Sequence, residues 1–182
     1  INGFKISLPC PGKLMAQNVL AVFSVANTMG LTPNQFATSV NTFKPLIGRG
    51  EVIIHNDIII IDDTYNANLD SAKAGIDTLS EYDGSRKIAI IGDMLELGEF
   101  AQIHHQELGQ YISNSNIDVL FATGELTQLT VNATRNVDAT FFQTKNELIS
   151  ALREMKQTGD VIYVKGSRGM KMETIIEKGI LH

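Results

Sequence analysis

The fold of this chain is decided by one stretch of sequence, Ile58-Ile59-Ile60-Ile61-Asp62-Asp63-Thr64-Tyr65-Asn66-Ala67-Asn68. The four isoleucines make an apolar run of strand length, which is typical of a strand covered on both faces. The polar residues after them form a loop, and a helical pattern then runs from residue 69 to residue 82. A buried strand, a polar loop and a helix in this order indicate an α/β domain.

The segments on either side extend this pattern. Upstream, residues 52–55 and 58–61 flank Asn56-Asp57, which predicts a hairpin with a two-residue turn. Downstream, strands are predicted at 87–91, 119–122, 139–142 and 161–164, and helices at 102–113, 126–133, 145–156 and 170–178. The alternation favours a doubly wound α/β domain with a mostly parallel sheet.

A different pattern occupies the first part of the chain. Residues 1–10 are predicted to be the end of a small sheet, because Phe4, Ile6 and Leu8 alternate with polar neighbours. Apolar residues at helical spacing predict a helix over residues 15–29. Thr32 and Gln35 have the spacing of a capping box, so a second helix is expected to begin at Pro33 and to end near residue 43.

The loop over residues 46–50 resembles a joint between domains. We therefore expect one domain segment over residues 1–47 and a second domain over residues 48–182. The chain begins at Ile1 rather than at Met, and it shows no basic segment followed by an apolar segment that would mark a signal peptide. The expectation is that these residues are a piece of a longer protein.

Composition excludes several classes of protein. Hydrophobic residues make up 43% of the 182 residues and charged residues 19%, which fits a folded chain with a core. The formal net charge of −5, with scattered Lys and Arg, argues against nucleic-acid binding. Cys10 is the only cysteine, so no disulfide forms within the chain and a reducing compartment fits best. No apolar run approaches the roughly 18 residues that a membrane span needs.

Polar loops follow four of the predicted strands. Open α/β sheets bind ligands beyond the carboxyl ends of their strands, and the helix that follows each loop offers N-terminal amides to anions. These loops are therefore expected to converge on one edge of the sheet. They are residues 62–68, 92–98, 122–125 and 165–168.

Each candidate residue in these loops has a functional and a structural interpretation. Asp62 and Asp63 could hold ribose hydroxyls, magnesium or a proton, or one of them could cap the next helix. Asn66 and Asn68 could bind a peptide-like substrate, but asparagine also completes turns by itself.

The loop Lys165-Gly166-Ser167-Arg168 suits a carboxylate or a phosphate, or it could be a solvated helix start. It is not a Walker A loop, because the pattern Gly-x-x-x-x-Gly-Lys-Ser/Thr occurs nowhere in the 182 residues. His104 and His105 are adjacent on a predicted helix and point about 100° apart. At most one of them can face the site, and a supporting role is expected rather than catalysis.

Three motifs in order resemble those of the Mur ligases. They are Asp-Asp-Thr-Tyr-Asn-Ala-Asn at 62–68, Gly-Asp-Met-Leu-Glu-Leu-Gly at 92–98 with His105 after it, and Lys-Gly-Ser-Arg at 165–168. Within the family, the chain resembles the type that joins D-alanyl-D-alanine to UDP-N-acetylmuramoyl-tripeptide. The resemblance covers nearly the whole chain, including residues 11–18 and the joint at Gly48-Arg49.

The resemblance implies three domains: a UDP-binding domain, a central ATPase domain with the P-loop, and a Rossmann-like C-terminal domain. Residues 1–47 would be the last segment of the central domain, and 48–182 the whole third domain. In the implied reaction, ATP phosphorylates the tripeptide carboxylate to an acyl phosphate during peptidoglycan precursor synthesis. The enzyme would be a monomer in the cytoplasm. The Mg²⁺ ligands and the P-loop would lie upstream, so no catalytic residue is assigned to this chain and it is expected to be inactive alone.

The resemblance also implies roles for single residues. ATP would be contacted by Asn18, Arg49, Asp63 and Tyr65, with Asn18 at the adenine, Arg49 at the phosphates and Asp63 at the ribose. The substrate would be contacted by Asn66, Asn68, Lys165, Ser167 and Arg168.

One departure from the family pattern concerns Leu14, which stands where these ligases usually carry His. It removes a polar aromatic contact that the family places near the nucleotide. Two alternatives stay open: another Mur-like ligase of the folylpolyglutamate or cyanophycin synthetase type, and a non-catalytic α/β module that binds a nucleotide or peptide.

Overall fold

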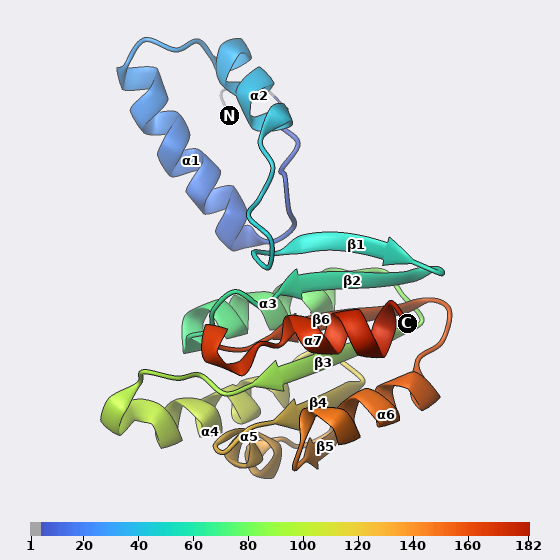
Figure 1. Ribbon diagram of the computed structural model, residues 1–182. Helices are drawn as coiled ribbons and strands as arrows, with labels where there is room; N and C mark the ends of the chain where they lie inside the picture. The colour runs from blue at the N-terminus through green and yellow to red at the C-terminus, as the bar shows by residue number, and fades with distance from the viewer. Residues whose placement is uncertain (1–4) are drawn as a thin grey trace. The chain divides into compact units, whose positions relative to one another are not determined.

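The computed structural model describes residues 5–182, and it divides into two compact units, Ile1–Leu46 and Ile47–His182 (Figure 1). The boundary lies one residue before the one expected from the sequence.

The first unit consists of α1 (Lys13–Thr28) and α2 (Pro33–Thr42). Phe23 and Phe36 meet edge to face at 5.1 Å between ring centroids, and Val40 completes this small core. Thr32 and Gln35 form the predicted capping box. The predicted strand over 4–8 is wrong for residues 5–8, since no segment of the described chain pairs with them; Phe4 lies outside the described residues. A strand requires ladder hydrogen bonds to a neighbour.

The second unit is built on a six-stranded sheet in the order β1-β2-β6-β3-β4-β5. β1 pairs antiparallel with β2, and the other neighbours are parallel. In Figure 1 the arrowhead of β1 accordingly points away from those of β2 and β3. The strands are β1 (Glu51–His55), β2 (Ile58–Asp63), β3 (Arg86–Gly92), β4 (Val119–Thr123), β5 (Asp138–Phe142) and β6 (Asp160–Lys165). This confirms the expected α/β fold.

The hairpin turn shows how local sequence sets this architecture. Asn56 and Asp57 have φ angles of 49° and 59°. Two successive residues with positive φ are what a type I′ turn requires, and asparagine and aspartate tolerate that conformation better than most residues. The turn places β1 at the edge of the sheet, with Glu51 opposite Asp62 and His55 opposite Ile58.

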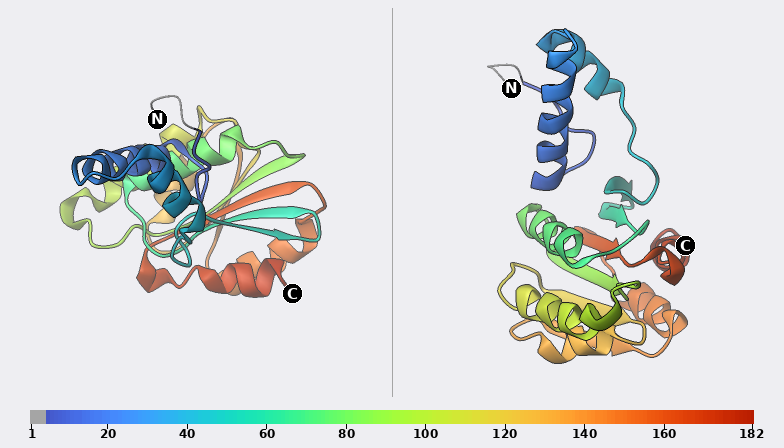
Figure 2. Two further views of the ribbon diagram at one scale, coloured as in Figure 1. Left: turned by 90° about the horizontal axis from the view of Figure 1, so that it is seen from above. Right: turned by 90° about the vertical axis from the view of Figure 1, so that its left-hand side faces the viewer.

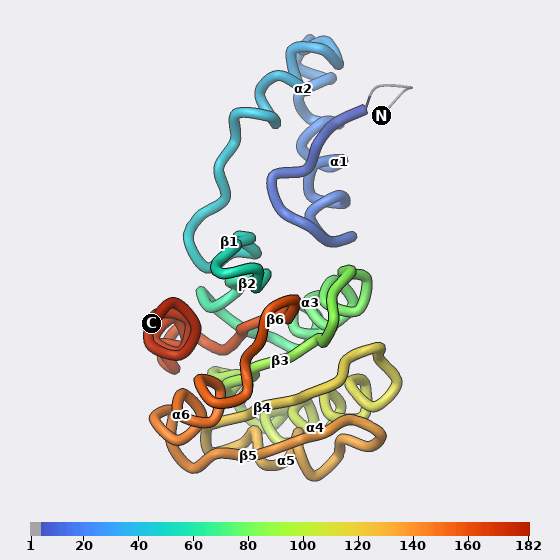
Figure 3. The backbone as a smooth tube through the Cα atoms, turned by 90° about the vertical axis from the view of Figure 1, so that its right-hand side faces the viewer, coloured from blue at the N-terminus to red at the C-terminus, as the bar shows by residue number. Residues whose placement is uncertain are grey.

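Helices cover both faces of the sheet (Figures 2 and 3). One face packs against α3 (Leu69–Glu81), α4 (Ala101–Ile112) and α5 (Thr127–Ala133). The other face packs against α6 (Lys145–Met155), α7 (Glu173–Ile175) and the π-helical turn Ile176–Ile180. Two 3₁₀ turns, Gly98–Phe100 and Arg168–Met170, precede α4 and α7. β4 and β6 are buried throughout, as the continuous apolar runs at 119–122 and 161–164 predicted.

The helix predicted over residues 170–178 is not continuous. Lys171 is left-handed with φ of 48° and separates the 3₁₀ turn from α7. The physical reason lies in Met172, which is fully buried under the strand ends. A Cβ at Gly92 would lie 2.6 Å from the Met172 sulfur, and one at Gly166 would lie 2.6 Å from its Cγ, so the chain bends to insert this side chain.

The chain order of the strands creates a topological switch point. The connections from β2 to β3, β4 and β5 advance in one direction across the sheet, whereas β6 returns to lie between β2 and β3. The segments after β2 and β6 therefore leave the sheet toward opposite faces. Ligands of open α/β sheets bind at such a switch point, which here lies at the carboxyl ends of β2, β6 and β3.

Candidate functional site

An ion pair lies at the switch point. Asp63 and Lys165 are the last residues of β2 and β6 and stand opposite each other in the parallel ladder. The Lys165 ammonium lies 2.5 Å from Oδ2 of Asp63 and also donates to the Asn66 carbonyl at 3.0 Å. The hydroxyl of Tyr163, two residues earlier on β6, donates to the same Oδ2 at 3.0 Å. The strand ends thus fix one carboxylate with two donors.

Burial and pairing act on this ion pair in opposite directions. The side chain of Lys165 is 2% exposed and that of Asp63 is 24% exposed. Burial raises the pKa of Asp63, and the charge and hydrogen bond of Lys165 act against that rise. Burial lowers the pKa of Lys165, and Asp63 opposes that change. Each charge is therefore stable in the fold largely because the other is present.

Asp62, the other aspartate of the motif, has a structural role. Its side chain is 5% exposed, and its Oδ1 accepts hydrogen bonds from the amide and the hydroxyl of Thr64 at 3.1 and 2.7 Å. Successive strand residues point to opposite faces, so Asp62 and Asp63 do not share a site. Of the two aspartates, only Asp63 belongs to the ion pair at the switch point.

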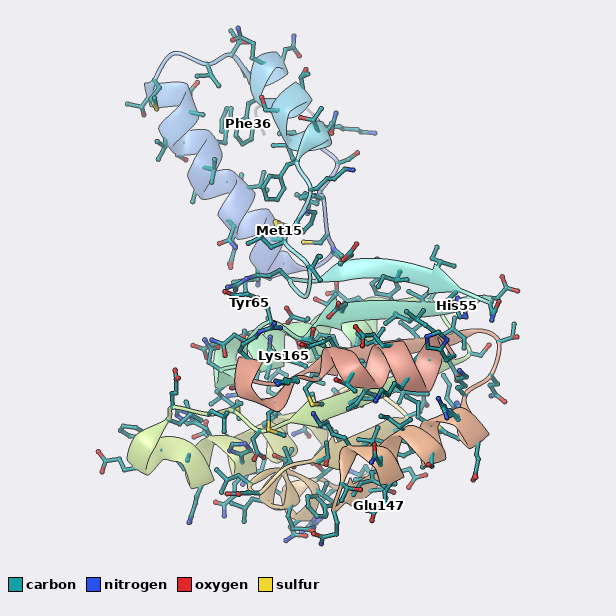
Figure 4. The ribbon with its side chains drawn as sticks, in the orientation of Figure 1. Met15, Phe36, His55, Tyr65, Glu147 and Lys165 are labelled. Carbon is teal, nitrogen blue, oxygen red and sulfur yellow. The ribbon has the colours of Figure 1, made fainter. Side chains whose placement is uncertain are left out.

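Two arginines flank Tyr65 at the same edge of the sheet. The Arg49 guanidinium lies 4.1 Å from the Tyr65 ring centroid and that of Arg168 lies 6.0 Å from it. Both distances fall within the range of cation–π attraction. Figure 4 shows Tyr65 and Lys165 at this edge. All three side chains of the cluster are exposed, and Arg168 also pairs with Glu173 at 3.2 Å.

The loop that carries Arg49 is fixed to β2. Tyr65 donates its amide to the Gly48 carbonyl at 2.9 Å, and Gly50 donates to the Asp62 carbonyl at 2.8 Å. Gly48 has φ of 75°, and a Cβ there would lie 3.0 Å from both the Thr64 hydroxyl and the Tyr65 nitrogen. The positive φ and this close approach both favour glycine here. The loop holds Arg49 as part of the sheet domain.

The asparagines of the motif make local bonds. Asn68 caps α3 by accepting the amide of Ser71 at 2.8 Å in a reciprocal capping arrangement. Oδ1 of Asn66 accepts the amide of Ala67 at 2.9 Å. These contacts match the turn-forming interpretation of the two residues. Their proposed contacts with substrate stay predictions.

We expect Asn68→Ala to lower the free energy of unfolding by about 1 kcal/mol, because an N-cap bond to α3 is lost. Asn68→Asp keeps the acceptor and should retain wild-type stability. Chemical denaturation measures both. Thr144→Ala, which removes the equivalent capping box of α6, is the matched control and should lose a similar amount. An unchanged midpoint for Asn68→Ala would show that the cap contributes nothing.

Ser167 joins two loops and is not free. Its hydroxyl accepts the amide of Leu95 at 2.8 Å and lies 3.5 Å from the Ala67 carbonyl. Its side chain is buried, and its own amide donates to the Asp93 carbonyl at 2.9 Å. The serine therefore links the loops after β2, β3 and β6.

Asp93 was not among the predicted site residues, yet it organises the adjoining loops. Its carboxylate is 3% exposed and accepts three amides at the start of α5, from Glu125 at 2.7 Å and from Leu126 and Thr127 at 3.0 Å. Gly124 has φ of 144°, and a Cβ there would lie 2.2 Å from this carboxylate. The Gly-Asp sequence at a strand end was the available signal, but its partner loop could not be identified from sequence.

His105 supports the same loop. Its Nε2 accepts the Met94 amide at 3.1 Å, and its Nδ1 donates to the Ala101 carbonyl at 2.6 Å, which requires the neutral ring with hydrogen on Nδ1. The ring is fully buried, whereas His104 stacks on Phe100. As expected for adjacent helix positions, only one of the two histidines supports the strand-end loops.

A groove of about 780 Å³ lies beside these loops, at the carboxyl ends of β3, β4 and β5. Its lining mixes apolar side chains with polar and charged ones. The residues that line it are Asp93, Leu95, Thr123, Gly124, Glu125, Gln128, Phe141, Gln143, Lys145 and Met170.

A family model for the Mur ligase, glutamate ligase domain matches residues 48–168, about two thirds of the chain. The chain belongs to the Mur ligase family. It is 35% identical over 179 residues to the UDP-N-acetylmuramoyl-tripeptide–D-alanyl-D-alanine ligase of Haemophilus influenzae, with 94% of this chain and 38% of that protein covered.

Two solved structures extend the comparison. MurF from Acinetobacter baumannii matches with a TM-score of 0.85 and 27% identity, over 94% of this chain and 38% of that one. MurF from Thermotoga maritima in complex with ADP matches with a TM-score of 0.81 and 25% identity, over 93% and 38%. This Mur ligase chain thus spans about two fifths of the length of the relatives that it matches.

Two observations bear on partners of this Mur ligase chain. In the part of the chain that the structure describes, no helix is long and apolar enough to cross a membrane, and no group of three or more His, Cys, Asp or Glu side chains could hold a metal ion. The donor set at the switch point does not fit Mg²⁺ either, because the charge of Asp63 is already paired with Lys165.

Asn18, the remaining predicted residue, is exposed on α1, and its contact with ATP stays a prediction.

Proposed function

We propose that this chain is the C-terminal part of an ATP-dependent ligase that adds D-alanyl-D-alanine to UDP-N-acetylmuramoyl-tripeptide in peptidoglycan precursor synthesis. The single observation that carries the proposal is the juxtaposition at the switch point. There a fixed carboxylate, Asp63, lies at the same strand ends as the cations of the Arg49–Tyr65–Arg168 cluster. A carboxylate suits ribose hydroxyls and guanidinium groups suit phosphates, so the edge has the chemistry of a nucleotide site.

The proposed reaction follows from the weak electrophilicity of a carboxylate. ATP phosphorylates the tripeptide carboxylate to an acyl phosphate, and the amine of the dipeptide then attacks the carbonyl and displaces phosphate. Exclusion of water protects such an intermediate from hydrolysis. Arg49 would bind the phosphates, where a planar fork suits developing negative charge. Asn66, Asn68, Lys165, Ser167 and Arg168 are proposed for the substrate side; of these, Arg168 has its charged head in solvent.

We further propose that this chain supplies only part of the active site. Residues 1–47 would belong to a central ATPase domain, with Asn18 at the adenine, and residues 48–182 would form the Rossmann-like third domain. The 182 residues contain no P-loop sequence, so the P-loop and the Mg²⁺ ligands would come from outside this chain, which would not ligate alone. The complete enzyme is proposed to act as a cytoplasmic monomer. The names of the similar proteins favour this substrate over those of a folylpolyglutamate or cyanophycin synthetase.

The test is steady-state kinetics of the complete protein that carries this chain. Asp63→Asn should raise KM for ATP about tenfold or more, because a charge-assisted hydrogen bond to the nucleotide is weakened. Arg49→Ala should lower kcat. Asp118→Asn, at an exposed carboxylate away from the switch point, is the matched control and should leave KM for ATP unchanged.

The alternatives predict different results. Unchanged ATP kinetics in both site variants would refute the nucleotide assignment. A non-catalytic binding module would release no phosphate from ATP when tripeptide substrate and D-alanyl-D-alanine are supplied together. A folylpolyglutamate-type ligase would release phosphate with a folate and glutamate instead.

A further inference from the structure

Tyr163 is a polar side chain in the apolar layer between the sheet and α3. It lies in the middle of β6 and is 1% exposed, among residues such as Ile61, Ile76 and Leu79. An aliphatic residue could fill this layer without a polar atom to satisfy, and a buried hydroxyl is tolerated only when it is hydrogen-bonded. Its partner is Oδ2 of Asp63, at 3.0 Å.

A second feature of the sequence accommodates the same ring. Gly75 lies in the interior of α3, where glycine costs about 1 kcal/mol relative to alanine. A Cβ at this position would lie 1.8 Å from the Tyr163 hydroxyl oxygen and 2.1 Å from the ring carbon that bears it. The helix is therefore shaped to admit this hydroxyl. A buried hydroxyl and a glycine inside a helix are each unfavourable alone, and both are needed for the hydrogen bond between Tyr163 and Asp63.

That hydrogen bond controls how the carboxylate is oriented. The torsion that rotates an aspartate carboxylate is broad, so the group needs partners to hold it in one orientation. Lys165 and Tyr163 both donate to Oδ2 of Asp63. No hydrogen bond to Oδ1 is present among the described residues, and the side chain is still 24% exposed. One oxygen is thus held by the sheet, and the other remains available to a ligand.

We propose that Tyr163 is a positioning residue of the nucleotide site: by holding Oδ2 of Asp63 together with Lys165, it presents Oδ1 to the ribose hydroxyls of the nucleotide. This inference rests on the proposed function. Tyr163 does not touch the ligand and acts only through Asp63. The bond also favours the ionised form of Asp63, since it lowers the pKa of a carboxyl that burial raises.

The experiment compares ATP with 2′,3′-dideoxy-ATP as substrates of the complete protein. In the wild type, loss of the ribose hydroxyls should raise KM. Tyr163→Phe keeps the ring and fills the same space, so the fold is retained. It should raise KM for ATP about five- to tenfold, which is the usual effect of losing one ordinary hydrogen bond, while KM for dideoxy-ATP stays unchanged. The ratio of KM for dideoxy-ATP to KM for ATP should therefore fall toward one in Tyr163→Phe.

A matched control is available on the neighbouring helices. Tyr111 donates to Oδ1 of Asp77 at 2.5 Å, which is the same pairing of tyrosine and aspartate away from the strand ends. Tyr111→Phe should keep the wild-type KM ratio. A merely structural role for Tyr163 would raise KM for both nucleotides together or lower kcat, and either result would overturn the proposal.

Asp63→Asn separates this proposal from the proposed function. If Asp63→Asn abolishes the discrimination between the two nucleotides and Tyr163→Phe does not, the nucleotide site stands and the positioning role is wrong. If Asp63→Asn retains the discrimination, the ribose contact of Asp63 and the positioning role of Tyr163 are both wrong.

The pH dependence of kcat/KM for ATP gives a second readout. The pKa of Asp63 is influenced by the charges of Lys165 and Asp62 and by the hydroxyl of Tyr163, while the charge of Arg49 acts on Lys165. Loss of the hydroxyl removes one influence that lowers the pKa of Asp63, so the acid limb of the profile should move to higher pH in Tyr163→Phe. An unmoved limb would contradict the proposal, and Tyr111→Phe provides the reference.

Discussion

Replacing Lys165 with methionine is expected to lower the free energy of unfolding at pH 7 by about 3 kcal/mol. Removing one member of a buried ion pair leaves the other charge without compensation, which typically costs 3–5 kcal/mol. Asp63 keeps some exposure and its bond from Tyr163, which places the expected loss at the lower end. Urea denaturation of the wild type and the variant measures it.

The loss should depend on pH in one direction. Lys165 supplies the largest influences that lower the pKa of Asp63, so this pKa rises further in the variant. A carboxyl whose pKa is raised in the folded state adds stability below its unfolded pKa and loses it as pH rises through the folded pKa. The deficit of Lys165→Met should therefore be small near pH 4 and grow toward pH 7.

Two controls accompany this substitution. Lys178→Met, at an exposed lysine, should leave stability within about 0.5 kcal/mol of the wild type. The double variant Asp63→Asn/Lys165→Met should be more stable than the sum of the single losses, because no unpaired charge remains. A Lys165→Met protein as stable as the wild type at pH 7 would show that the pair contributes nothing.

Asp93→Ala is expected to have a comparable effect, again about 3 kcal/mol. It leaves three amides at the start of α5 without their carboxylate, and each such bond to a charged acceptor contributes more than an ordinary hydrogen bond. Water from the adjoining groove can replace part of the loss, so the effect should be smaller than the sum of three bonds.

Asp118→Ala provides the matched control for this substitution. Its carboxylate accepts one amide, that of Lys87 at 2.7 Å, at an exposed position, and its loss should cost about 1 kcal/mol. Amide hydrogen exchange of Glu125, Leu126 and Thr127 should accelerate in Asp93→Ala and not in Asp118→Ala. Unchanged exchange at these amides would contradict the role assigned to Asp93.

Features determined by neighbouring residues could be predicted from the sequence. The hairpin turn at Asn56-Asp57 and the capping box of Thr32 and Gln35 depend on residues close together in the chain, and both predictions are confirmed. The parallel sheet followed from the alternation of strands and helices. A local, turn-forming role was one of the two interpretations open for Asn68, and the structure shows this residue as the N-cap of α3.

Features that depend on distant pairing could not be predicted. Lys165 is 102 residues from Asp63, and the two meet only because β6 returns between β2 and β3, which the order of elements does not reveal. The internal contacts that bury Lys165 and Ser167 could not be predicted for this reason, and their contact with substrate stays a prediction. Asp93 was overlooked for the same reason, since its partners follow a different strand.

The space shared by Gly75 and Tyr163 has a consequence for the evolution of this family. The two positions occupy one volume between a helix and a strand, so neither can change in size independently of the other. A relative with a shorter side chain at position 163 is released from the need for glycine at position 75, whereas one that keeps the ring is not. These positions should covary across an alignment, and the lineages that retain both would be those in which the carboxylate is held from within the sheet.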